Sequence, residues 1–442
     1  VWGICEGNIP QTLVWGAFLT SLSFLVFTFL SFLAINYWSA SWAAPIISNE
    51  ELVTISDDQI IITCQTTNEP SIGGIKWGLS PNLGNITRES SATNYHYLTL
   101  GNLHPNTTYY YKVFCQSSSG TSESAVRSFT TLPRPSGNYL FTFAVLSDLH
   151  YAPNLNNTKD IRGRPYNSSE AIVSNLVSAI NQFSPDFTII KGDMIDSGIN
   201  LSAYPVESSL KPKLDLLTAK GSTKYYVIPG NHDKSASYGG GNWVANNLIV
   251  LYPSGPSVAP TSDASFNYSF TYQGYRFIML DSSTHTGITA EVNISSLEAE
   301  LNAAKANKQK AFIFMHHEAT KEPDIPSGIL AAVLNQTTFT EADWDKIRIS
   351  NYEQFFNKLN EYKLDNGEPV VAGVFMGHIH DNRRRDFYGI PFVRTSSGLQ
   401  FPTGFNIYKV YSNGYLQSFY KLPGYSEEIA RELITGTQEV TK

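Results

Sequence analysis

Between residues 138 and 425, six apolar runs of strand length end in polar residues, and this pattern constrains the fold more than any other feature. The runs are YLFTFAVLSD, FTIIKGD, KYYVIPGN, RFIMLDS, KAFIFMHH and VVAGVFMGH. Helical patterns such as EAIVSNLVSAINQF and ISNYEQFFNKLNEY lie between several of them, with apolar residues at steps of three and four. Strands that alternate with helices predict an α/β domain. Its ligand crevice is expected at the carboxyl ends of the strands.

The polar residues at these strand ends form five motifs. They are Asp148-Leu149-His150, Gly192-Asp193-Met194-Ile195-Asp196, Gly230-Asn231-His232-Asp233, His316-His317 and Gly377-His378-Ile379-His380. So many carboxylates and imidazoles would be costly to bury without partners, and metal ions are their natural partners. Imidazole and carboxylate without thiolate suit Zn, Fe, Mn, Co or Ni. Seven donors are too many for one small ion with an open position, so we expect two ions bridged by a carboxylate.

The order of the five motifs resembles that of the calcineurin-like metallophosphoesterase superfamily. The resemblance implies a four-layer α/β/β/α fold over residues 138–425 and two divalent or trivalent transition-metal ions (Mn, Fe, Zn or Co). It implies that Asp148, His150, Asp193 and His380 bind the first ion, and that Asp193, Asn231, His316 and His378 bind the second. It further implies that His232 assists the leaving group and that Asp196 holds His232. A metal-bridging hydroxide would then attack a phosphomonoester or phosphodiester.

Three positions separate the chain from the nearest branches of that superfamily. Purple acid phosphatases carry D-x-G and GD-x-x-Y, whereas this chain has His150 in place of the glycine and Asp196 in place of the tyrosine. We therefore predict a colourless enzyme, since no tyrosinate is available to bind ferric iron. Protein Ser/Thr phosphatases follow GD-x-x-D with Arg-Gly, but Ser197 stands here instead of the arginine. The substrate class stays open.

The roles of a few neighbouring residues stay open as well. His317 either supports a metal ligand from behind or lies at the rim of the site. Asp281 ends RFIMLD and is expected to serve a turn. Residues 151–170 and 233–267 adjoin the motifs and are rich in Asn, Gly, Ser and Pro. We expect these two loops to form the rim that sets specificity.

Residues 46–133 carry short alternating runs separated by Asn, Gly, Pro and Ser, which is typical of an all-β sandwich. The run LHPNTTYYYKV resembles fibronectin type III domains and the amino-terminal sandwich of purple acid phosphatases. Trp77 and Tyr109 are expected to be core and corner residues rather than binding residues. Cys64 and Cys115 lie in two of the predicted strands, and we expect a disulfide between them if the compartment is oxidising. Two buried thiols are the alternative.

Residues 12–35, TLVWGAFLTSLSFLVFTFLSFLAI, contain no charged side chain and predict a transmembrane helix or a long signal-anchor. A helix of that length rises about 36 Å, enough to cross a hydrocarbon core of about 30 Å. The alternative is a signal peptide that is cleaved near Ala43. At the other end, residues 426–442 are expected to form a tail.

Sequence features outside the motifs predict where the protein acts. N-x-[ST] sequons favour a glycosylated exterior surface, and they occur at Asn85, Asn106, Asn156, Asn167, Asn200, Asn267, Asn293 and Asn335. We therefore expect a single-pass protein of the cell membrane with its catalytic domain outside, or a secreted one if the amino-terminal segment is cleaved. A net charge of −7 gives no attraction to nucleic acid, so a small phosphate ester and the membrane are the expected partners.

Two other functions remain open from the sequence. One is a cell-surface adhesion or envelope protein, in which the β-sandwich is the functional part and the metal site is vestigial. The other is a nuclease of the same superfamily, which the low net basicity disfavours because nucleic-acid affinity depends on phosphate neutralisation by Lys and Arg.

Overall fold

The computed structural model describes most of the chain from residue 43 onward. The described residues are 43–155, 164–196, 199–234, 249–251, 266–284, 289–320, 327, 330, 338–400 and 402–423. The predicted membrane segment 12–35, the tail 426–442, Ser197, the sequons Asn156 and Asn335, and parts of both rim loops lie outside them. Within the described ranges, no helix has the length and apolar character needed to cross a membrane.

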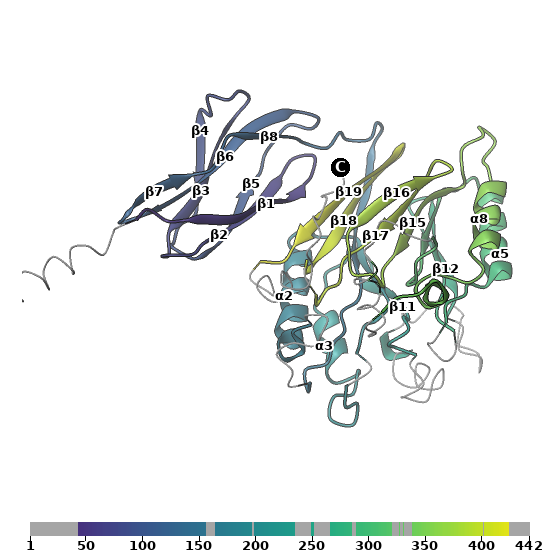
Figure 1. Cartoon of the computed structure of the whole chain (residues 1–442). Helices are drawn as coiled ribbons and strands as arrows, with labels where there is room; N and C mark the ends of the chain where they lie inside the picture. Colours follow the sequence, from purple (N-terminus) through teal and green to yellow (C-terminus); the bar gives the residue numbers. More distant parts are fainter. Residues whose placement is uncertain are drawn as a thin grey trace, which may run out of the picture.

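The amino-terminal domain is a sandwich of two antiparallel sheets (Figure 1). One sheet has the order β1-β2-β5, with β1 (Ile47–Ile55), β2 (Ile60–Thr66) and β5 (Tyr95–Leu100). The other has the order β4-β3-β6-β7, with β8 also paired to β6, and consists of β4 (Asn85–Arg88), β3 (Ile72–Gly78), β6 (Thr108–Ser117), β7 (Gly120–Glu123) and β8 (Arg127–Thr130). The all-β domain predicted from the sequence is confirmed.

Strand β6 shows why this segment forms a sandwich. Tyr109, Tyr111 and Val113 are buried, whereas the residues between them are partly exposed, which is the period of two of a strand with one face in a core. The Trp77 and Tyr109 rings meet edge to face with centroids 5.9 Å apart. The Tyr109 hydroxyl accepts a hydrogen bond of 3.0 Å from the backbone N–H of His104. Tyr109 is therefore both a core residue and the anchor of a corner.

The structure does not contain the disulfide that was predicted between the two cysteines of the sandwich. Cys64 on β2 and Cys115 on β6 belong to the same core but come from facing sheets. Both are free, buried thiols in the structure. A hydrogen bond from the Cys64 thiol lowers the pKa of Cys115 to about 5, and His96 acts in the same direction. The structure thus has the alternative of two buried thiols.

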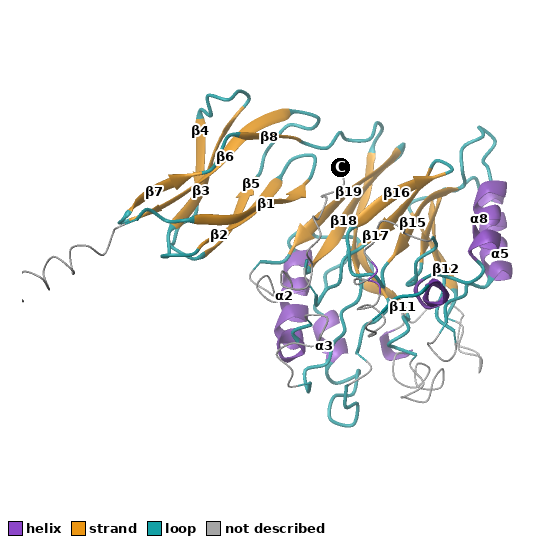
Figure 2. Ribbon diagram, in the orientation of Figure 1, coloured by secondary structure: helices purple, strands orange, loops and turns teal. Residues whose placement is uncertain are grey.

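The carboxyl-terminal domain contains two larger sheets (Figure 2). The first has the order β11-β10-β9-β18-β19, with β11 (Tyr225–Ile228), β10 (Phe187–Lys191), β9 (Tyr139–Leu146), β18 (Gly404–Tyr411) and β19 (Gly414–Lys421). The second has the order β12-β13-β14-β15-β17-β16, with β12 (Tyr268–Tyr272), β13 (Tyr275–Met279), β14 (Ala311–Phe314), β15 (Val371–Met376), β17 (Ile390–Arg394) and β16 (Arg383–Phe387).

Helices lie on the outer faces of these sheets (Figure 1). The longer ones are α2 (Ser169–Asn181), α5 (Ile294–Ala306) and α8 (Tyr352–Glu361). The shorter ones are η1 (Tyr166–Ser168), α3 (Leu210–Leu214), η3 (Ile249–Leu251), η4 (Glu341–Asp343) and α7 (Trp344–Ile347). In α2, Ile172, Leu176 and Ile180 are buried at steps of four, which is the apolar stripe that the sequence predicts.

Along the central strands, alternate side chains point into different cores and so connect the layers. On β9, Phe143 packs between the two sheets against Phe277 and Phe312. Its neighbours Ala144 and Leu146 point the other way, into a separate core that contains the apolar stripe of α2. A third core lies between the second sheet and helices α5 and α8. The predicted four-layer α/β/β/α arrangement is therefore present, and successive side chains of one strand serve different layers.

Direct contacts fix the sandwich to the carboxyl-terminal domain. The Tyr97 hydroxyl donates a hydrogen bond of 2.7 Å to the carbonyl oxygen of Lys421 on β19. The ammonium of Lys409 on β18 lies 2.8 Å from the buried carboxylate of Asp57, which also pairs with Arg134. Ile61 of β2 belongs to the apolar core that lies under α2. The interface therefore combines apolar packing with a buried carboxylate that is neutralised by two partly exposed cations.

Candidate metal centre

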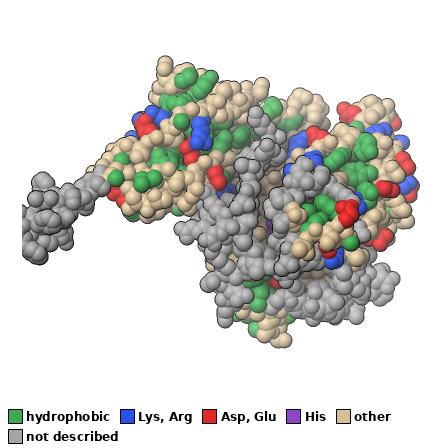
Figure 3. Space-filling view, viewed as in Figure 1, with side chains coloured by type: hydrophobic (Ala, Val, Ile, Leu, Met, Phe, Trp, Pro, Cys, Tyr) green, Lys and Arg blue, Asp and Glu red, His purple; other side chains and the backbone are tan. Residues whose placement is uncertain are grey.

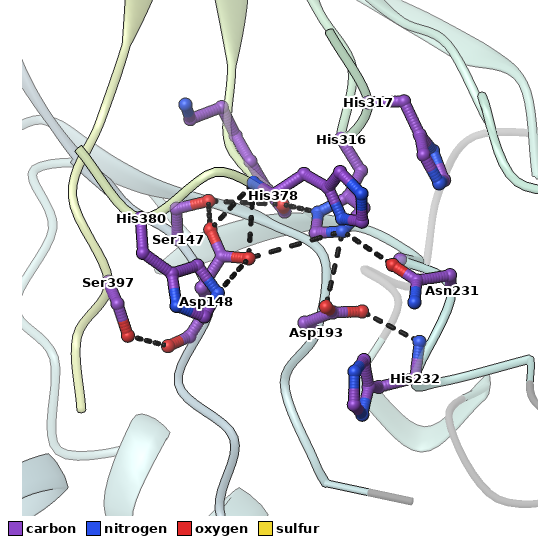
Figure 4. A network of polar contacts seen from close by, with 12 residues as sticks. Ser147, Asp148, Asp193, Asn231, His232, His316, His317, His378, His380 and Ser397 are labelled. Atoms are coloured by element: carbon purple, nitrogen blue, oxygen red, sulfur yellow. Dashed lines mark hydrogen bonds and ion pairs between the residues drawn. The ribbon is translucent and has the colours of Figure 1, made fainter. Parts of the chain in front are cut away.

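The five motifs meet because they follow the carboxyl ends of five strands. Strands β9, β10 and β11 are parallel in the first sheet, and β14 and β15 are parallel in the second. Asp148, Asp193, Asn231, His316 and His378 all come within a few residues of these ends. Figure 4 shows their side chains pointing toward one another. Most of them are buried.

The backbone at the site adopts a conformation that most residues avoid. Five predicted ligands have φ between 40° and 70°, namely Asp148, His150, Asp193, His378 and His380. This left-handed region is uncommon for residues with a Cβ atom and costs free energy. It turns the chain sharply just after each strand, so that the side chain projects into the centre. Such outliers gather at functional sites, where the surrounding structure holds them.

Two glycines of the motifs allow the ligands to approach closely. A Cβ atom on Gly230 would collide with the Asp193 carboxylate. A Cβ atom on Gly377 would collide with the side chains of Ser147 and Asp148. Each glycine is therefore required by a ligand from another strand rather than by its own turn.

The first group of donors contains Asp148, His150 and His380, whose ligand atoms all lie within 4.8 Å of one another. The Nε2 atoms of His150 and His380 are 3.1 Å apart, and Oδ1 of Asp148 is 3.2 Å from Nε2 of His380. The Nδ1 atom of His380 lies 2.7 Å from the side-chain oxygen of Gln400, and Nδ1 of His150 lies 3.1 Å from Asp196. Nδ1 of His150 makes no hydrogen bond within the described part of the chain, whereas the two Nε2 atoms form one in which one ring donates to the other.

The second group surrounds His316. Its Nδ1 donates a hydrogen bond of 2.9 Å to the carbonyl oxygen of Lys191, which leaves Nε2 as the metal-facing atom. That Nε2 lies 3.1 Å from Oδ1 of Asn231 and 3.2 Å from Oδ2 of Asp193. Burial opposes a charge here, but the carboxylates of Asp193 and Asp148 raise the pKa of His316 to about 9. A proton on His316 therefore balances these carboxylates in the metal-free chain.

His378 completes the second group. Its Nε2 atom is buried and makes no hydrogen bond within the described part of the chain. Burial and the neighbouring His316 lower the pKa of His378 to about 3, so the ring is neutral and keeps a lone pair. A buried nitrogen of this kind is costly without a partner, and a metal ion would satisfy it.

Asp193 lies between the two groups, as expected of a bridging carboxylate. Its Oδ2 atom is 3.2 Å from Nε2 of His316 and 3.7 Å from Nε2 of His150. Its Oδ1 atom accepts a hydrogen bond of 2.8 Å from the backbone N–H of His232. The seven residues proposed from the motifs are thus all brought together, and their imidazole, carboxylate and amide groups fit two cations.

The positions of His232 and Asp196 differ from those expected if Asp196 held His232. His232 is partly exposed, and its ring lies at right angles to that of His150 with centroids 4.6 Å apart. Its Nδ1 atom is 3.6 Å from Oδ2 of Asp196, which is too long for a hydrogen bond. The same carboxylate oxygen is closer to Nδ1 of His150, at 3.1 Å. Asp196 therefore contacts a metal ligand more closely than it contacts His232.

His317 and Asp281, whose roles the sequence left open, are both supporting residues. His317 is buried, with its Nδ1 atom 3.1 Å from the Ser282 hydroxyl and its ring 4.7 Å from that of His378. It therefore lies behind a ligand and not at the rim. Asp281 pairs with the buried Lys234 and accepts a hydrogen bond of 3.1 Å from the backbone N–H of Ser283. This is the structural role that was expected of it.

Asp233 fastens the ligand loops to one another. Its carboxylate accepts hydrogen bonds from the backbone N–H groups of Gly230 at 2.8 Å, Met194 at 3.1 Å and Ile195 at 3.2 Å. Burial raises the pKa of Asp233 to about 7, and the nearby Asp193 adds to this shift. The last residue of GNHD thus joins the loop after β11 to the loop after β10.

Sequence reasoning missed several charged residues behind the site. Lys191 is fully buried at the end of β10, where its ammonium donates to the carbonyl oxygen of Met376. Burial lowers the pKa of Lys191 to about 7. A lysine that ends the apolar run FTIIK is the signal that could have drawn attention to it, because a charged residue in a buried strand needs a partner.

A buried ion cluster joins two other ligand loops. Arg394 on β17 donates from Nη1 to Glu318 at 2.7 Å, and from Nε and Nη2 to the two oxygens of Asp381 at 2.6 and 2.8 Å. Glu318 is two residues beyond His316, and Asp381 directly follows His380. No sequence signal pointed to Arg394, because its partners come from separate segments of the chain.

Comparisons with known proteins agree with this geometry. A family model described as calcineurin-like phosphoesterase matches residues 141–382. The chain is similar to the structure of a dimetal phosphatase from Danio rerio, with 16% identity, a TM-score of 0.45, and coverage of 62% of this chain and 94% of that one. It is also similar to a purple acid phosphatase from yellow lupin (Lupinus luteus) seeds, with 14% identity, a TM-score of 0.43, and coverage of 90% and 78%.

The sandwich has its own structural neighbour, the fibronectin type III domain of a human fibronectin type III domain containing protein, with 19% identity, a TM-score of 0.18, and coverage of 22% of this chain and 94% of that one. No curated protein sequence matches the chain.

The fold and the site together define a metal-dependent phosphoesterase. The matched residues 141–382 make up more than half of the 442 residues. The chain therefore belongs to the calcineurin-like phosphoesterase family, with a fibronectin III-like domain ahead of the catalytic domain.

Proposed function

We propose that this protein hydrolyses small phosphomonoesters or phosphodiesters outside the cytoplasm, with two transition-metal ions (Mn, Fe, Zn or Co) as cofactors. The observation that carries the proposal is the convergence of imidazole, carboxylate and amide donors, above all the facing Nε2 atoms of His150 and His380. When bound, such ions polarise phosphoryl oxygens and lower the pKa of water. Asp148, His150, Asp193 and His380 would hold one ion, and Asp193, Asn231, His316 and His378 the other.

The residues of the chain itself would then bind and orient the ester. The backbone N–H of His232 donates to Asp193, which fixes the position of the His232 ring beside the metal ligands. The His232 side chain is about one-eighth exposed (13%), so a substrate can reach it, in contrast to the fully buried His150. A histidine in this place can hand a proton to the leaving oxygen, which contributes about 10²- to 10⁴-fold to such reactions.

A substrate panel on the full chain tests this function. Bis(p-nitrophenyl) phosphate and p-nitrophenyl phosphate would be offered with Mn²⁺, Zn²⁺, Fe²⁺ and Co²⁺ in turn. We expect hydrolysis with at least one ion, and loss of hydrolysis in Asp193→Asn and His232→Ala. The exposed His104→Ala in the sandwich is the matched control. Full activity in both site variants, with the same ion dependence, would refute the proposal.

The extracytoplasmic location rests on the sequons and their exposure. Five of the sequon asparagines are exposed, so each has room for an N-linked glycan. They are Asn85, Asn106, Asn167, Asn200 and Asn293. Asn267 is the exception, because it is partly buried and its side-chain oxygen accepts a hydrogen bond from the backbone of Asp281. Deglycosylation of the protein from a eukaryotic secretory host should lower its mass. An unchanged mass would count against an exported, glycosylated protein.

Two other functions are less well supported. A vestigial site in an adhesion protein is expected to have lost a ligand, whereas all seven donors are in place. Metal analysis separates the two, since about two ions per chain support the enzyme and none supports the adhesion protein. For a nuclease, the face drawn in Figure 3 mixes Lys and Arg with Asp and Glu among its described residues, which favours a small substrate over nucleic acid. Salt-sensitive cleavage of DNA would reverse that preference.

A further inference from the structure

The carboxylate of Asp196 collects several donors on one oxygen atom. Arg164 donates to Oδ2 from Nη1 at 2.8 Å, and the Tyr166 hydroxyl donates to the same oxygen at 2.8 Å. Nδ1 of His150 lies 3.1 Å from this oxygen. Arg164 and Tyr166 also contact each other, with Nη1 3.2 Å from the hydroxyl oxygen. Arg164, Tyr166 and Asp196 are all buried.

The position of Asp196 decides which nitrogen of His150 faces the metal centre. When a cation takes the lone pair of Nε2, the proton of His150 has to lie on Nδ1, and the Asp196 carboxylate 3.1 Å away stabilises it there. Nε2 of His150 is the atom that meets Nε2 of His380 in the first group of donors. A rotation of the Asp196 carboxylate would therefore release the His150 ring and misdirect its lone pair.

Arg164 and Tyr166 oppose such a rotation. The guanidinium balances the buried negative charge of Asp196, which would otherwise be costly. The two residues flank Pro165 just before α2, whereas Asp196 follows β10, so the contact ties the segment before α2 to the ligand loop of β10. An isolated bridge between Tyr151 and Ile195 pairs that ligand loop with the chain just after His150.

We propose that Arg164 and Tyr166 are positioning residues, which hold Asp196 against His150 and thereby set the affinity of the first metal ion without contacting it. This inference rests on the proposed function only through the metal sites and not through the substrate. By this inference Asp196 acts chiefly by supporting the candidate metal ligand His150, whereas the family resemblance implied that it acts through His232.

The test is a titration of the metal-free full chain with Mn²⁺, and separately with Zn²⁺, by calorimetry. His150→Ala and His316→Ala identify the binding step that belongs to each ion. We expect Arg164→Lys to weaken the step lost in His150→Ala by at least about 10-fold, as loss of a residue behind a ligand does, and Tyr166→Phe to weaken it less. The step lost in His316→Ala should keep its affinity in both variants.

Tyr225→Phe is a matched control, because Tyr225 is similarly buried and donates to a carboxylate, that of Asp215, at the same distance of 2.8 Å. Arg276→Lys, which breaks a pair with Glu300 away from the site, is the control for arginine. Neither control should change either binding step. Since Tyr166→Phe removes a single oxygen atom, it keeps the test valid if the arginine variant folds poorly.

The outcomes separate this inference from the proposed function. Unchanged affinities in Arg164→Lys and Tyr166→Phe would overturn the positioning role, as would an equal weakening of both steps together with a lower melting temperature of the metal-free chain. A chain that binds two ions but hydrolyses no phosphate ester would refute the proposed function and leave this inference standing. A chain that binds neither ion would overturn both.

Discussion

The Nε2 atoms of His150 and His380 face each other at 3.1 Å in the protein interior, although the Nδ1 atom of each ring already faces an oxygen acceptor. One of these nitrogens donates a proton to the other, and a cation bound between them would take the place of that proton. At His316 the proton on Nε2 faces the oxygens of Asp193 and Asn231, and a cation would likewise take its place. The arrangement of these candidate ligands therefore suits bound cations.

The first prediction follows from that relationship. Metal ions at about 100 times their dissociation constant should stabilise the chain by about 2.7 kcal/mol, because they bind the folded state alone. Calorimetry with and without a chelator would measure this as a rise in melting temperature of several degrees. Asp193→Asn, which alters the bridging ligand, should lose most of the rise. An equal rise in that variant would place the ions elsewhere.

A second prediction concerns protons. The pKa of His316 is raised from its usual value of 6.5 to about 9 against the effect of burial, by Asp193 and Asp148. Its contribution to stability is therefore fully present below pH 6.5 and is lost as the pH rises through about 9. Metal binding near pH 7.5 should release about one proton from this ring. Titrations in buffers of different ionisation enthalpy would count it, and His316→Gln should release one proton fewer.

The third prediction separates His232 from Asp196. His232→Ala should lower kcat by about 10²- to 10⁴-fold while two ions stay bound, because His232 is placed to act on the substrate. Asp196→Asn should lower the metal content as well as the rate, because Asp196 lies closer to His150 than to His232. Metal analysis of dialysed variants decides between them. Full metal occupancy in Asp196→Asn would show that Asp196 acts through His232 alone.

A fourth prediction concerns the buried ion cluster of Arg394. Arg394→Met should destabilise the chain by about 3–5 kcal/mol, because it leaves the Glu318 carboxylate buried without its partner. Urea unfolding measures the loss. Arg384→Met on the adjacent strand is the matched control, since Arg384 is exposed and should cost little. Similar losses of unfolding free energy in the two variants would show that the Arg394 cluster contributes no more to stability than a surface charge does.

The fifth prediction addresses the interface between the domains. Burial opposes the charge of Asp57, but Lys409 and Arg134 hold its pKa below the usual value of 3.8. The contribution to stability is therefore present above pH 3.8 and is lost as the pH falls through the lower pKa of the folded state. Asp57→Asn should weaken the interface by about 1.5–3 kcal/mol and separate the unfolding of the two domains in calorimetry. The exposed Asp365→Asn should leave the unfolding profile unchanged.

The sequence by itself determined the layers of the fold and the candidate metal ligands. Both are local properties, since Tyr109 and Tyr111 show the period of two of a strand, Ile172 and Leu176 show the stripe of a helix, and Asp148 or His316 can be recognised from the motif around it. Parallel strands also bring their carboxyl ends to one edge, so motifs at those ends must meet.

Only the tertiary structure decided which residues support the ligands. Arg164 reaches Asp196 across 32 positions, and Arg394 reaches Glu318 across 76, so nothing local marks either contact. The structure likewise turned Asp196 toward His150, and it left Cys64 and Cys115 as free thiols. These outcomes depend on how loops from different strands pack together. They are decided by differences of a few tenths of an ångström between contact distances, and such differences arise only when both sheets are in place.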